Sequence, residues 1–421
     1  MKIHVFTILL TNLLFHQTLS ESPEIQTGYE VTLAIPSEYT KGFLGRAFLI
    51  ETEQTTPYFR AAISVEAANN GKYYSCSLDV FLGDVRVWSS GHLSKFYTSE
   101  KCVVELTEYG DLRLKGQRER VGWRSGTSGQ GVKRLILLRT GNLVLVDDFN
   151  SIKWQSFNFP TDIMLWGQRL SSQTRLTSFP KVNSTLFYSM EIQNNKIALY
   201  LNFGKWKYSY WEYQPHGHQN ITFVQLTSNG LDLFNGRHKF DQIKSIGPGP
   251  GSGPVRFLAL DNSTGNLRLY QYSEEKEKFE ASYQAINFTC DLPLACDQPY
   301  GICTSSGSCS CIRGLGPDCN KENFEGLCGK SEGEMVELQG VVSVLRSVVF
   351  RGNVGKMECV RLCLDDCNCL AVEYVENNED GLGDCFVYRM VRGIKEVEKG
   401  RNNVTYMVKV PKGGDGRKIC S

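Results

Sequence analysis

The chain has 421 residues, with 46 Lys and Arg against 45 Asp and Glu, so its formal net charge at pH 7 is only +1. This balance excludes the strong basic field by which many proteins bind nucleic acid. The length exceeds what one hydrophobic core commonly serves, so we expect several domains.

The N-terminus resembles a secretory signal peptide over residues 1–20. Met1-Lys2 is basic, Ile3 to Phe15 is mostly apolar, and Thr18-Leu19-Ser20 offers small residues where signal peptidase would cut before Glu21. The apolar stretch is too short to anchor the chain in a bilayer. We therefore predict a secreted protein.

The rest of the chain has no run of about 18 apolar residues, so the sequence predicts no later transmembrane helix. Residues 412–421 form a Gly- and Lys-rich tail. A membrane anchor would have to follow Ser421, in a longer form held at the extracellular face of the plasma membrane.

Five N-x-Ser/Thr sequons agree with secretion, because their glycans are attached to exposed chain in the secretory pathway. The predicted glycosylation sites are Asn183, Asn220, Asn262, Asn287 and Asn403.

From Glu21 to about residue 285, short alternating apolar runs are separated by Gly, Asn and Asp, which is typical of strands joined by tight turns. The unit L-x3-G-[ND]-L-x-L occurs at 106–114 and 137–145, with looser copies at 226–234 and 260–270. We expect Gly with Asn or Asp to supply the positive φ of each turn. One hairpin cannot bury its apolar face alone, so the recurrence predicts a closed or prism-like assembly of sheets.

A block at residues 153–170 reads KWQSFNFPTD and continues to LWGQRL. It resembles the W-Q-S-F-[DN]-x-P-T-D-T-x-L-x-G-Q-x-L signature of plant bulb-type (G-type) lectin domains, found in S-locus glycoproteins and in the ectodomains of S-domain receptor-like kinases. The resemblance implies a mainly β chain with tandem β-prism domains. These would be a bulb-type lectin domain over 21–152 and a second lectin-like, S-locus-glycoprotein-like region over 153–285.

Three aromatic residues of this block, Trp154, Phe157 and Phe159, are expected to be core and packing residues rather than ligand contacts. Large aromatic side chains are mostly buried for the apolar area they carry.

Six cysteines lie between residues 290 and 319 with the spacing C-x5-C-x6-C-x5-C-x-C-x7-C. So short a segment cannot support a hydrophobic core, so we predict a disulfide scaffold, and the absence of histidine disfavours zinc. The residues alone leave the connectivity open. The spacing resembles an EGF-like module over 286–322. Its pattern would pair Cys290 with Cys303, Cys296 with Cys309, and Cys311 with Cys319.

A second cysteine group contains C-x3-C-x3-C-x-C at 359–369, where helical spacing places the first three sulfurs along one face. A helix stapled to a sheet would follow. The run resembles that of the α+β PAN/apple module of the same plant family, which implies such a module over 328–411. By that resemblance Cys359 pairs with Cys385, Cys363 with Cys369, and Cys328 with Cys367.

Three cysteines lie outside these groups. Cys76 and Cys102 belong to one β region and most simply pair with each other. Cys420 is then left over, as a free thiol, as an intermolecular bridge, or as a sign that the chain continues. A homodimer would form through the PAN module or through Cys420.

Catalytic and metal-binding patterns are missing from the sequence, which contains no nucleophile elbow, kinase signature, HExxH motif or phosphate loop. The Gly- and Pro-rich residues 247–254 lack the Lys-Ser/Thr and the helix that a phosphate loop requires. Asp147 and Asp148 are adjacent, so in a strand they would point to opposite faces. His216 and His218 could share a face, yet no third ligand accompanies them. We predict no enzyme, no cofactor and no metal site.

Mannose binding is the activity that the resemblance raises. Bulb-type lectins bind mannose through Q-x-D-x-N-x-V-x-Y, whose polar side chains line one face of a strand. Aligning its Asn with Asp111, Asn142 or Asn266 never recovers the set of Gln, Asp, Asn and Tyr. The aligned residues are Thr107, Tyr109, Arg113 and Lys115 in the first copy, Leu138, Thr140, Val144 and Val146 in the second, and Asn262, Thr264, Arg268 and Tyr270 in the third. We expect the fold to persist without mannose affinity at these sites.

Two functions remain on the sequence. The first is extracellular recognition of a protein or peptide ligand, or of a cell-surface glycan, in a receptor-like or co-receptor role. The second is an active mannose-binding lectin. The degenerate motifs favour the first, and an extracellular hydrolase would need catalytic residues that the sequence lacks.

Overall fold

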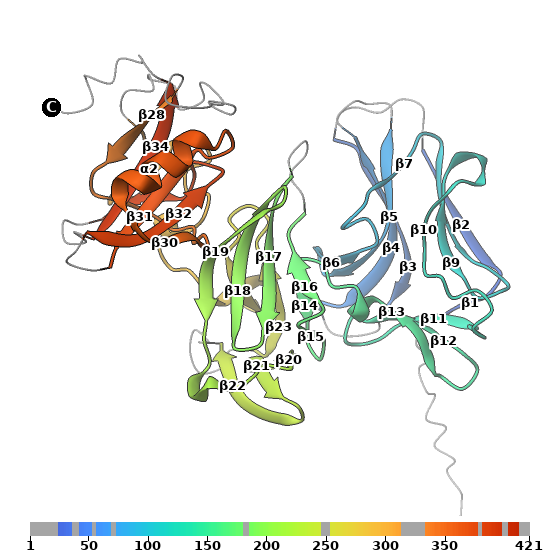
Figure 1. Ribbon diagram of the computed structural model, residues 1–421. Coiled ribbons are helices and arrows are strands. Elements are labelled where there is room, and N and C mark those ends of the chain that lie inside the picture. Colours follow the sequence, from blue (N-terminus) through green and yellow to red (C-terminus); the bar gives the residue numbers. More distant parts are fainter. Residues whose placement is uncertain are drawn as a thin grey trace, which may run out of the picture.

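The structure is a computed structural model, and it describes residues 24–35, 42–52, 56–68, 73–179, 185–245, 253–312, 333–377, 381–397 and 403–411. Within this part of the chain nearly all regular structure is β-strand, which confirms the predicted class. The strands form two three-sheet units and a C-terminal α+β unit, which follow one another along the chain (Figure 1).

The first unit contains three antiparallel sheets. One sheet has the order β1 (Glu24–Gln26), β11 (Arg134–Leu137), β12 (Leu143–Val146) and β13 (Ile152–Gln155). The second has the order β10 (Val121–Arg124), β9 (Leu112–Lys115), β8 (Lys101–Leu106) and β2 (Tyr29–Ala34). The third has the order β3 (Leu44–Glu51), β4 (Phe59–Ala67), β5 (Tyr74–Leu82) and β6 (Val85–Ser89), with β7 (Phe96–Thr98) also paired to β5.

Three tryptophans meet where these sheets converge, and each comes from a different sheet. Trp88 lies on β6, Trp123 on β10 and Trp154 on β13. Each pair is edge-to-face, with ring centroids 5.8 to 6.3 Å apart. This is a favourable geometry for aromatic quadrupoles, so the cluster ties the three sheets together at one point.

The second unit repeats the three-sheet plan. Its first sheet has the order β14 (Ile163–Leu165), β23 (Val255–Leu260), β24 (Leu267–Ser273) and β25 (Lys278–Gln284). The second has the order β15 (Arg169–Ser171), β20 (Phe223–Thr227), β21 (Gly230–Asn235) and β22 (His238–Lys244). The third has the order β16 (Arg175–Thr177), β17 (Leu186–Gln193), β18 (Lys196–Phe203) and β19 (Trp206–Tyr213).

The sequence repeats fall on hairpins of two sheets in each unit. The copies at 106–114 and 137–145 span β8–β9 and β11–β12, and the looser copies at 226–234 and 260–270 span β20–β21 and β23–β24. The third sheet of each unit carries no copy. Because β13 pairs with β12, the first unit extends to Gln155, slightly beyond the limit of 152 expected from the sequence.

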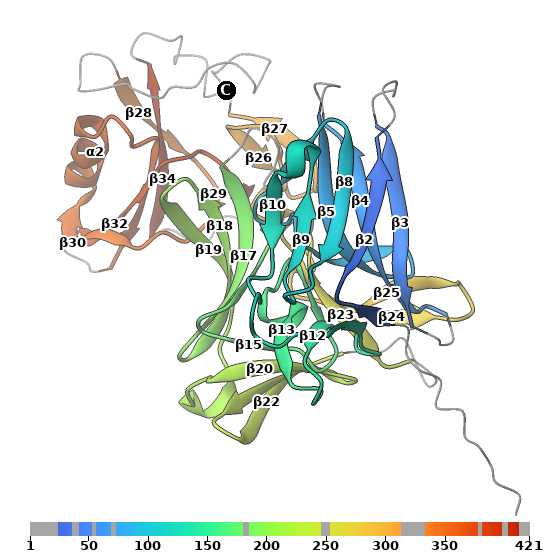
Figure 2. The same ribbon diagram turned by 90° about the vertical axis from the view of Figure 1, so that its right-hand side faces the viewer.

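The C-terminal unit packs one helix, α2 (Lys356–Asp365), on a five-stranded sheet (Figures 1 and 2). This sheet has the order β28 (Gly333–Leu338), β34 (Val404–Pro411), β31 (Ala371–Glu376), β32 (Leu382–Tyr388) and β30 (Val349–Gly355). A smaller sheet has the order β27 (Cys309–Cys311), β26 (Gly301–Cys303), β33 (Ile394–Glu396) and β29 (Val341–Ser343). The smaller sheet therefore joins the segment expected to be EGF-like to the segment expected to be PAN-like.

The second unit and the C-terminal unit share a continuous hydrophobic core. Tyr208 stacks on Tyr388 with centroids 5.7 Å apart, and the Tyr208 hydroxyl accepts a hydrogen bond from the backbone N–H of Arg389 at 2.9 Å. The backbones of Ser209 and Arg346 also pair. These contacts fix the C-terminal unit against β19.

Within the described residues, no helix is long and apolar enough to cross a membrane.

Candidate functional site

The turn glycines of the repeats adopt the left-handed conformation that the sequence predicts. Gly110, Gly141 and Gly265 have φ of 80°, 82° and 73°. A Cβ on Gly141 would lie 2.4 Å from the Phe59 ring, and one on Gly110 would lie 2.7 Å from Val132. Each glycine is therefore needed for its φ and for close packing.

The Asp or Asn that follows each glycine has a different role from the one expected. None of Asp111, Asn142 and Asn266 has positive φ, so the glycine alone makes the turn. The side chains of these residues are buried, with 5%, 5% and 1% exposure. They hold a segment that comes later in the chain.

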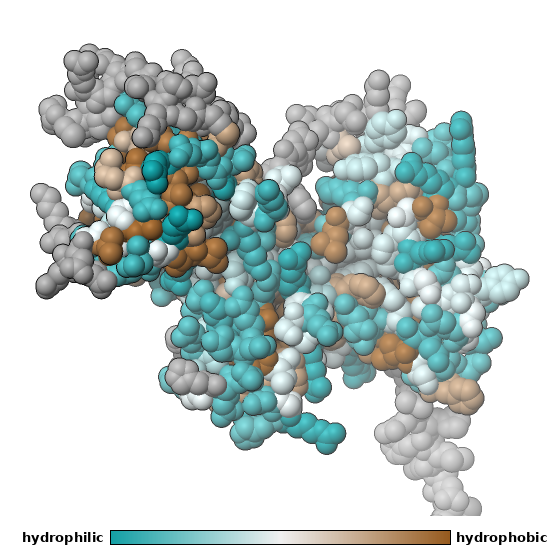
Figure 3. Space-filling model, viewed as in Figure 1, coloured by the Kyte–Doolittle hydropathy of each residue, from teal (hydrophilic) through white to brown (hydrophobic). Residues whose placement is uncertain are grey.

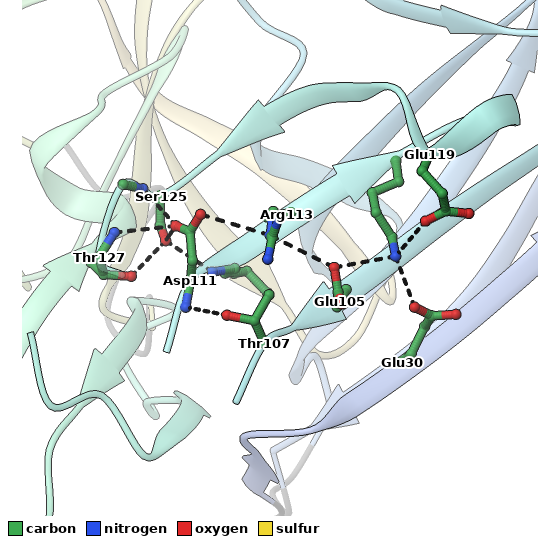
Figure 4. A network of polar contacts seen from close by, with 11 residues as sticks. Glu30, Glu105, Thr107, Asp111, Arg113, Glu119, Ser125 and Thr127 are labelled. Carbon is green, nitrogen blue, oxygen red and sulfur yellow. Dashed lines mark hydrogen bonds and ion pairs between the residues drawn. The ribbon is translucent and has the colours of Figure 1, made fainter. Parts of the chain in front are cut away.

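In the first copy, Asp111 Oδ1 accepts hydrogen bonds from the backbone N–H groups of Gly126 and Thr127 at 2.9 and 3.2 Å (Figure 4). It also accepts one from the Ser125 hydroxyl at 3.1 Å. That hydroxyl oxygen in turn accepts the N–H of Leu112 at 3.0 Å. The carboxylate thus fastens the chain after β10 to the turn before β9.

The second copy repeats this arrangement. Asn142 Oδ1 accepts from the Ser156 hydroxyl and from the N–H of Phe157, both at 3.2 Å, while Ser156 Oγ accepts the N–H of Leu143 at 3.0 Å. Asn142 Nδ2 donates to Gln155 Oε1 at 2.7 Å. Asn142 therefore holds the chain that follows β13.

The third copy uses both atoms of the amide on one residue. Asn266 Nδ2 donates to the carbonyl of Ile286 at 2.8 Å, and Asn266 Oδ1 accepts the N–H of Ile286 at 3.0 Å. A neighbouring sugar hydroxyl would have to break these bonds. The three positions expected to mark degenerate sugar sites are thus internal latches.

Two charged residues of the first expected sugar site, Arg113 and Lys115, lie beside carboxylates of the protein. Lys115 Nζ lies 2.8, 2.9 and 3.2 Å from carboxylate oxygens of Glu119, Glu30 and Glu105. Arg113 Nε lies 3.6 Å from Glu105, so the two basic residues share that carboxylate (Figure 4). The Lys115 ammonium group is therefore bound by carboxylates of the protein itself.

The pKa values in this network follow from its geometry. Burial alone would lower the pKa of Lys115, but its hydrogen bonds to Glu119, Glu30 and Glu105 raise it above the usual value. Hydrogen bonds from Lys115 and Lys101 lower the pKa of Glu119 to about 2. Both groups are therefore charged at neutral pH.

The second expected site is largely apolar, since Val144 and Val146 are buried and Leu138 stands where a mannose site needs a polar side chain, which leaves Thr140 as its one polar residue beside Asn142. In the third expected sugar site, the side chains contact other residues of the protein. Arg268 pairs with Asp261 at 3.0 Å, and Tyr270 stacks on Phe257 with centroids 4.8 Å apart. None of the three faces presents a free set of sugar-binding groups.

The comparisons with known proteins agree with this architecture. Residues 86–186 match the family described as D-mannose binding lectin. A G-type lectin S-receptor-like serine/threonine-protein kinase of Arabidopsis thaliana is 24% identical over 78% of this chain and 41% of its own length. A PAN domain-containing protein of the same plant is 27% identical over 66% of this chain and 58% of its own length. The chain therefore contains a segment of the bulb-lectin type and is similar to S-locus-like receptor and PAN domain-containing proteins.

The chain thus spans about half the length of these relatives. Among solved structures, a monomeric mannose-binding lectin of Gastrodia elata covers 32% of this chain and 96% of its own chain, at 21% identity and a TM-score of 0.20.

The signature block at residues 153–170 is structural. Gln168, which is buried, accepts the N–H of Leu165 through Oε1 and donates to the carbonyl of Phe157 through Nε2, both at 3.0 Å. Trp154 is buried as expected and Phe157 is half-buried. The expectation of a core position is wrong for Phe159, which is 54% exposed and stacks on Trp154 from outside, because its carbonyl is fixed by the Trp88 indole N–H.

The structure contains disulfide bonds between five of the cysteine pairs expected from the sequence. They are Cys76–Cys102, Cys290–Cys303, Cys296–Cys309, Cys359–Cys385 and Cys363–Cys369. Cys311 and Cys367 are also disulfide-bonded. Their expected partners, Cys319 and Cys328, lie outside the described residues, as does Cys420.

The sequon residues differ in their surroundings. Asn220, Asn287 and Asn403 are exposed, and Asn183 lies outside the described residues. Asn262 uses both amide atoms, because Oδ1 accepts the N–H of Phe179 and Nδ2 donates to Asp162.

The expected absence of a metal site at the two histidines remains a prediction. The His216 side chain is fully exposed, 3.6 Å from Asp241, and the side chain of His218 lies outside the description. In the described part of the chain, no three His, Cys, Asp or Glu residues gather in a metal-binding geometry.

The Asp147 carboxylate accepts hydrogen bonds from the backbone N–H groups of Phe149 and Ser151, which makes it a turn residue.

A feature that the sequence analysis missed is a cleft of about 1110 Å³ between the two three-sheet units. Its walls come from the β5–β6 turn of the first unit and from β23, β24 and β25 of the second. No local motif could reveal it, because it exists only where the two units meet.

Proposed function

We propose that this protein is a non-enzymatic extracellular recognition protein, in which the lectin-like and C-terminal modules bind a protein or peptide partner in a receptor-like or co-receptor role. One observation carries the proposal: Asp111, Asn142 and Asn266 use their polar atoms in internal hydrogen bonds. Replacing such bonds by bonds to a sugar would leave buried backbone groups unpaired, which is costly.

Secretion through the signal peptide at residues 1–20 belongs to this proposal. So do the assignment of residues 286–322 to an EGF-like module and of 328–411 to a PAN/apple module. The receptor-kinase and PAN-domain relatives support it, because they carry similar sequence next to parts that this chain does not span. The disulfides of the C-terminal unit suit an oxidising extracellular compartment.

The C-terminal unit offers a surface for self-association. Hydrophobic side chains gather on the face of this unit seen in Figure 3. Val348, Val349, Phe350 and Met357 are exposed on or beside β30, which is an edge strand. An edge with exposed apolar side chains favours pairing with another chain, so we propose that a homodimer forms either through this edge or through Cys420.

A glycan array tests the proposal against the mannose-lectin alternative. We expect secreted chain 21–421 to show no binding that free mannose inhibits, beside a bulb lectin as positive control. The chain should also co-purify the same cell-surface protein from membranes with and without enzymatic removal of N-glycans. Mannose-inhibitable binding that is lost in Tyr109→Ala, an exposed residue of the first expected site, would overturn the proposal.

A further inference from the structure

The cleft between the two three-sheet units is held open by direct contacts between them. Arg256 Nη2 donates to the carbonyl of Pro57 at 3.3 Å. A Cβ on Gly83 would lie 4.0 Å from the Phe279 ring and 3.4 Å from Pro57. The β5–β6 turn and β24–β25 therefore approach closely at one end, and the space beside them forms the cleft.

The floor of the cleft is aromatic. Phe257 is buried and packs against Tyr270 and Phe279, with centroids 4.8 and 5.0 Å away. Phe279 in turn meets Tyr272 edge-to-face at 5.2 Å. Tyr270 and Tyr272 alternate on β24, so they point to the same side of the sheet. Tyr270, Tyr272 and Phe279 are only half-buried, which leaves ring surface open to a ligand.

The rim of the cleft is negative. Glu274 and Glu277 are exposed in the β24–β25 turn, and neither forms an ion pair with a cation among the residues that the structure describes. The neighbouring bases neutralise them only in part, because Lys276 and Lys278 share the Glu280 carboxylate at 2.9 and 3.8 Å, which leaves one positive charge against the two of Glu274 and Glu277. On the opposite wall, the exposed Asp84 carboxylate lies 3.6 Å from Arg60 Nη2, so its charge already has a partner.

The cations of the cleft are already engaged. Arg86, on the wall from the first unit, pairs with Glu66 at 2.8 Å. Lys278, on the other wall, lies 3.8 Å from Glu280. At the inner end, the Asp162 carboxylate accepts a hydrogen bond from Asn262. The available charge in the cleft is therefore negative above an aromatic floor.

We propose that this cleft binds a cationic peptide segment, with a Lys or Arg side chain over the rings of Tyr272 and Phe279 and its charge near Glu274 and Glu277. Cations are attracted to aromatic faces and pair with carboxylates, and the cleft is large enough for several side chains. The inference rests on the proposed recognition function and adds the chemistry of the partner. A neutral saccharide would leave the rim carboxylates without a counter-charge.

The test is fluorescence anisotropy with labelled hexa-arginine and hexa-glutamate peptides and the full secreted chain. We expect binding of the arginine peptide only. Glu274→Gln and Glu277→Gln should each weaken it about two- to fivefold, the range for a partly exposed ion pair. Tyr272→Ala should weaken it as well. Glu275→Gln is the matched control, because Glu275 lies in the same exposed turn without lining the cleft.

Equal losses in Glu275→Gln and Glu277→Gln would overturn the inference, since they would show diffuse surface attraction. So would absence of arginine-peptide binding, or displacement of the peptide by a neutral mannan oligosaccharide. The glutamine variants keep side-chain volume at exposed positions, so folding is preserved. If the arginine peptide fails while the cell-surface protein still co-purifies, this inference fails and the proposed recognition function stands.

Discussion

The Asp or Asn after the turn glycine differs between the repeats, so isosteric substitutions at Asp111 and Asn266 should destabilise the protein to different extents. Asp111 only accepts hydrogen bonds, whereas Asn266 also donates one, from Nδ2 to the carbonyl of Ile286. Asp111→Asn keeps the accepting oxygen and removes only the 3.8 Å ion pair between the other carboxylate oxygen and Arg113 Nε. Asn266→Asp replaces the donor by a second carboxylate oxygen, which faces the Ile286 carbonyl in a site with 1% exposure.

The magnitude follows from the lost bond. A buried carbonyl left unpaired costs about 1–3 kcal/mol, and carboxylate burial adds to it, so Asn266→Asp should lose about 2–4 kcal/mol at pH 7. For a unit of this size that is a fall in Tm of about 5–15 °C. Asp111→Asn should lose less than about 1 kcal/mol.

Thermal unfolding followed by tryptophan fluorescence and circular dichroism measures both variants. At low pH the introduced carboxyl group becomes protonated and can donate to Ile286 again, so the Asn266→Asp deficit should shrink as the pH falls. Equal Tm values for the two variants at pH 7, or a deficit that stays constant with pH, would refute the latch assignment.

Two further predictions concern buried rings. Burial lowers the pKa of His92 to about 4, so the folded protein binds fewer protons than the unfolded chain between that value and 6.5. The contribution of neutral His92 to the free energy of unfolding is therefore fully present above pH 6.5. As the pH falls toward 4, the free energy of unfolding decreases by up to about 3 kcal/mol. His92→Gln should flatten this dependence and His216→Gln, at an exposed site, should not, as urea titrations across this range would show. In the tryptophan cluster, Trp154→Ala should lower the free energy of unfolding by about 3–5 kcal/mol and Phe159→Ala by less than about 1.5 kcal/mol, because only Trp154 is buried. Equal shifts of the urea midpoint in the two variants would contradict this prediction.

The repeat hairpins were predictable because their determinants are local. Each turn needs a glycine for its φ, and alternating leucines fix which face is buried, so both signals lie within a few residues. The third sheet of each unit escaped the pattern. The β5–β6 hairpin turns at Gly83-Asp84, but the leucine spacing of the repeat unit is missing there. The β17–β18 hairpin has no glycine in its turn.

The latch role could not be derived from one turn alone, because the partners lie farther along the chain. Ser125 follows Asp111 by 14 residues, and Ser156 follows Asn142 by the same interval. That shared spacing is the sequence signal that could have identified the latch in the first two copies. The third copy lacks it, because Asn266 bonds the backbone of Ile286.

The limits between modules were harder to predict for another reason. Cysteine spacing divides the C-terminal third into two groups, yet Ile302 of one group pairs in parallel with Ile394 of the other. A parallel strand pair between distant segments leaves no local mark in the sequence. The spacing therefore describes covalent links, while the sheet shows that the two segments fold against each other.

The internal hydrogen bonds of Asp111, Asn142 and Asn266 show that this fold can be kept without a sugar-binding role for these residues. Buried residues such as Asn142 are required for the hairpins to hold their neighbours, so selection for folding alone would retain them. Exposed positions such as Tyr109 carry no such requirement and can change without loss of the fold. A match to a mannose-lectin family therefore reports the latches and the core more than any ligand. A binding site is better sought where a charged group lacks a partner within the protein. Glu274 and Glu277 are such groups, because their carboxylates form no ion pair among the described residues.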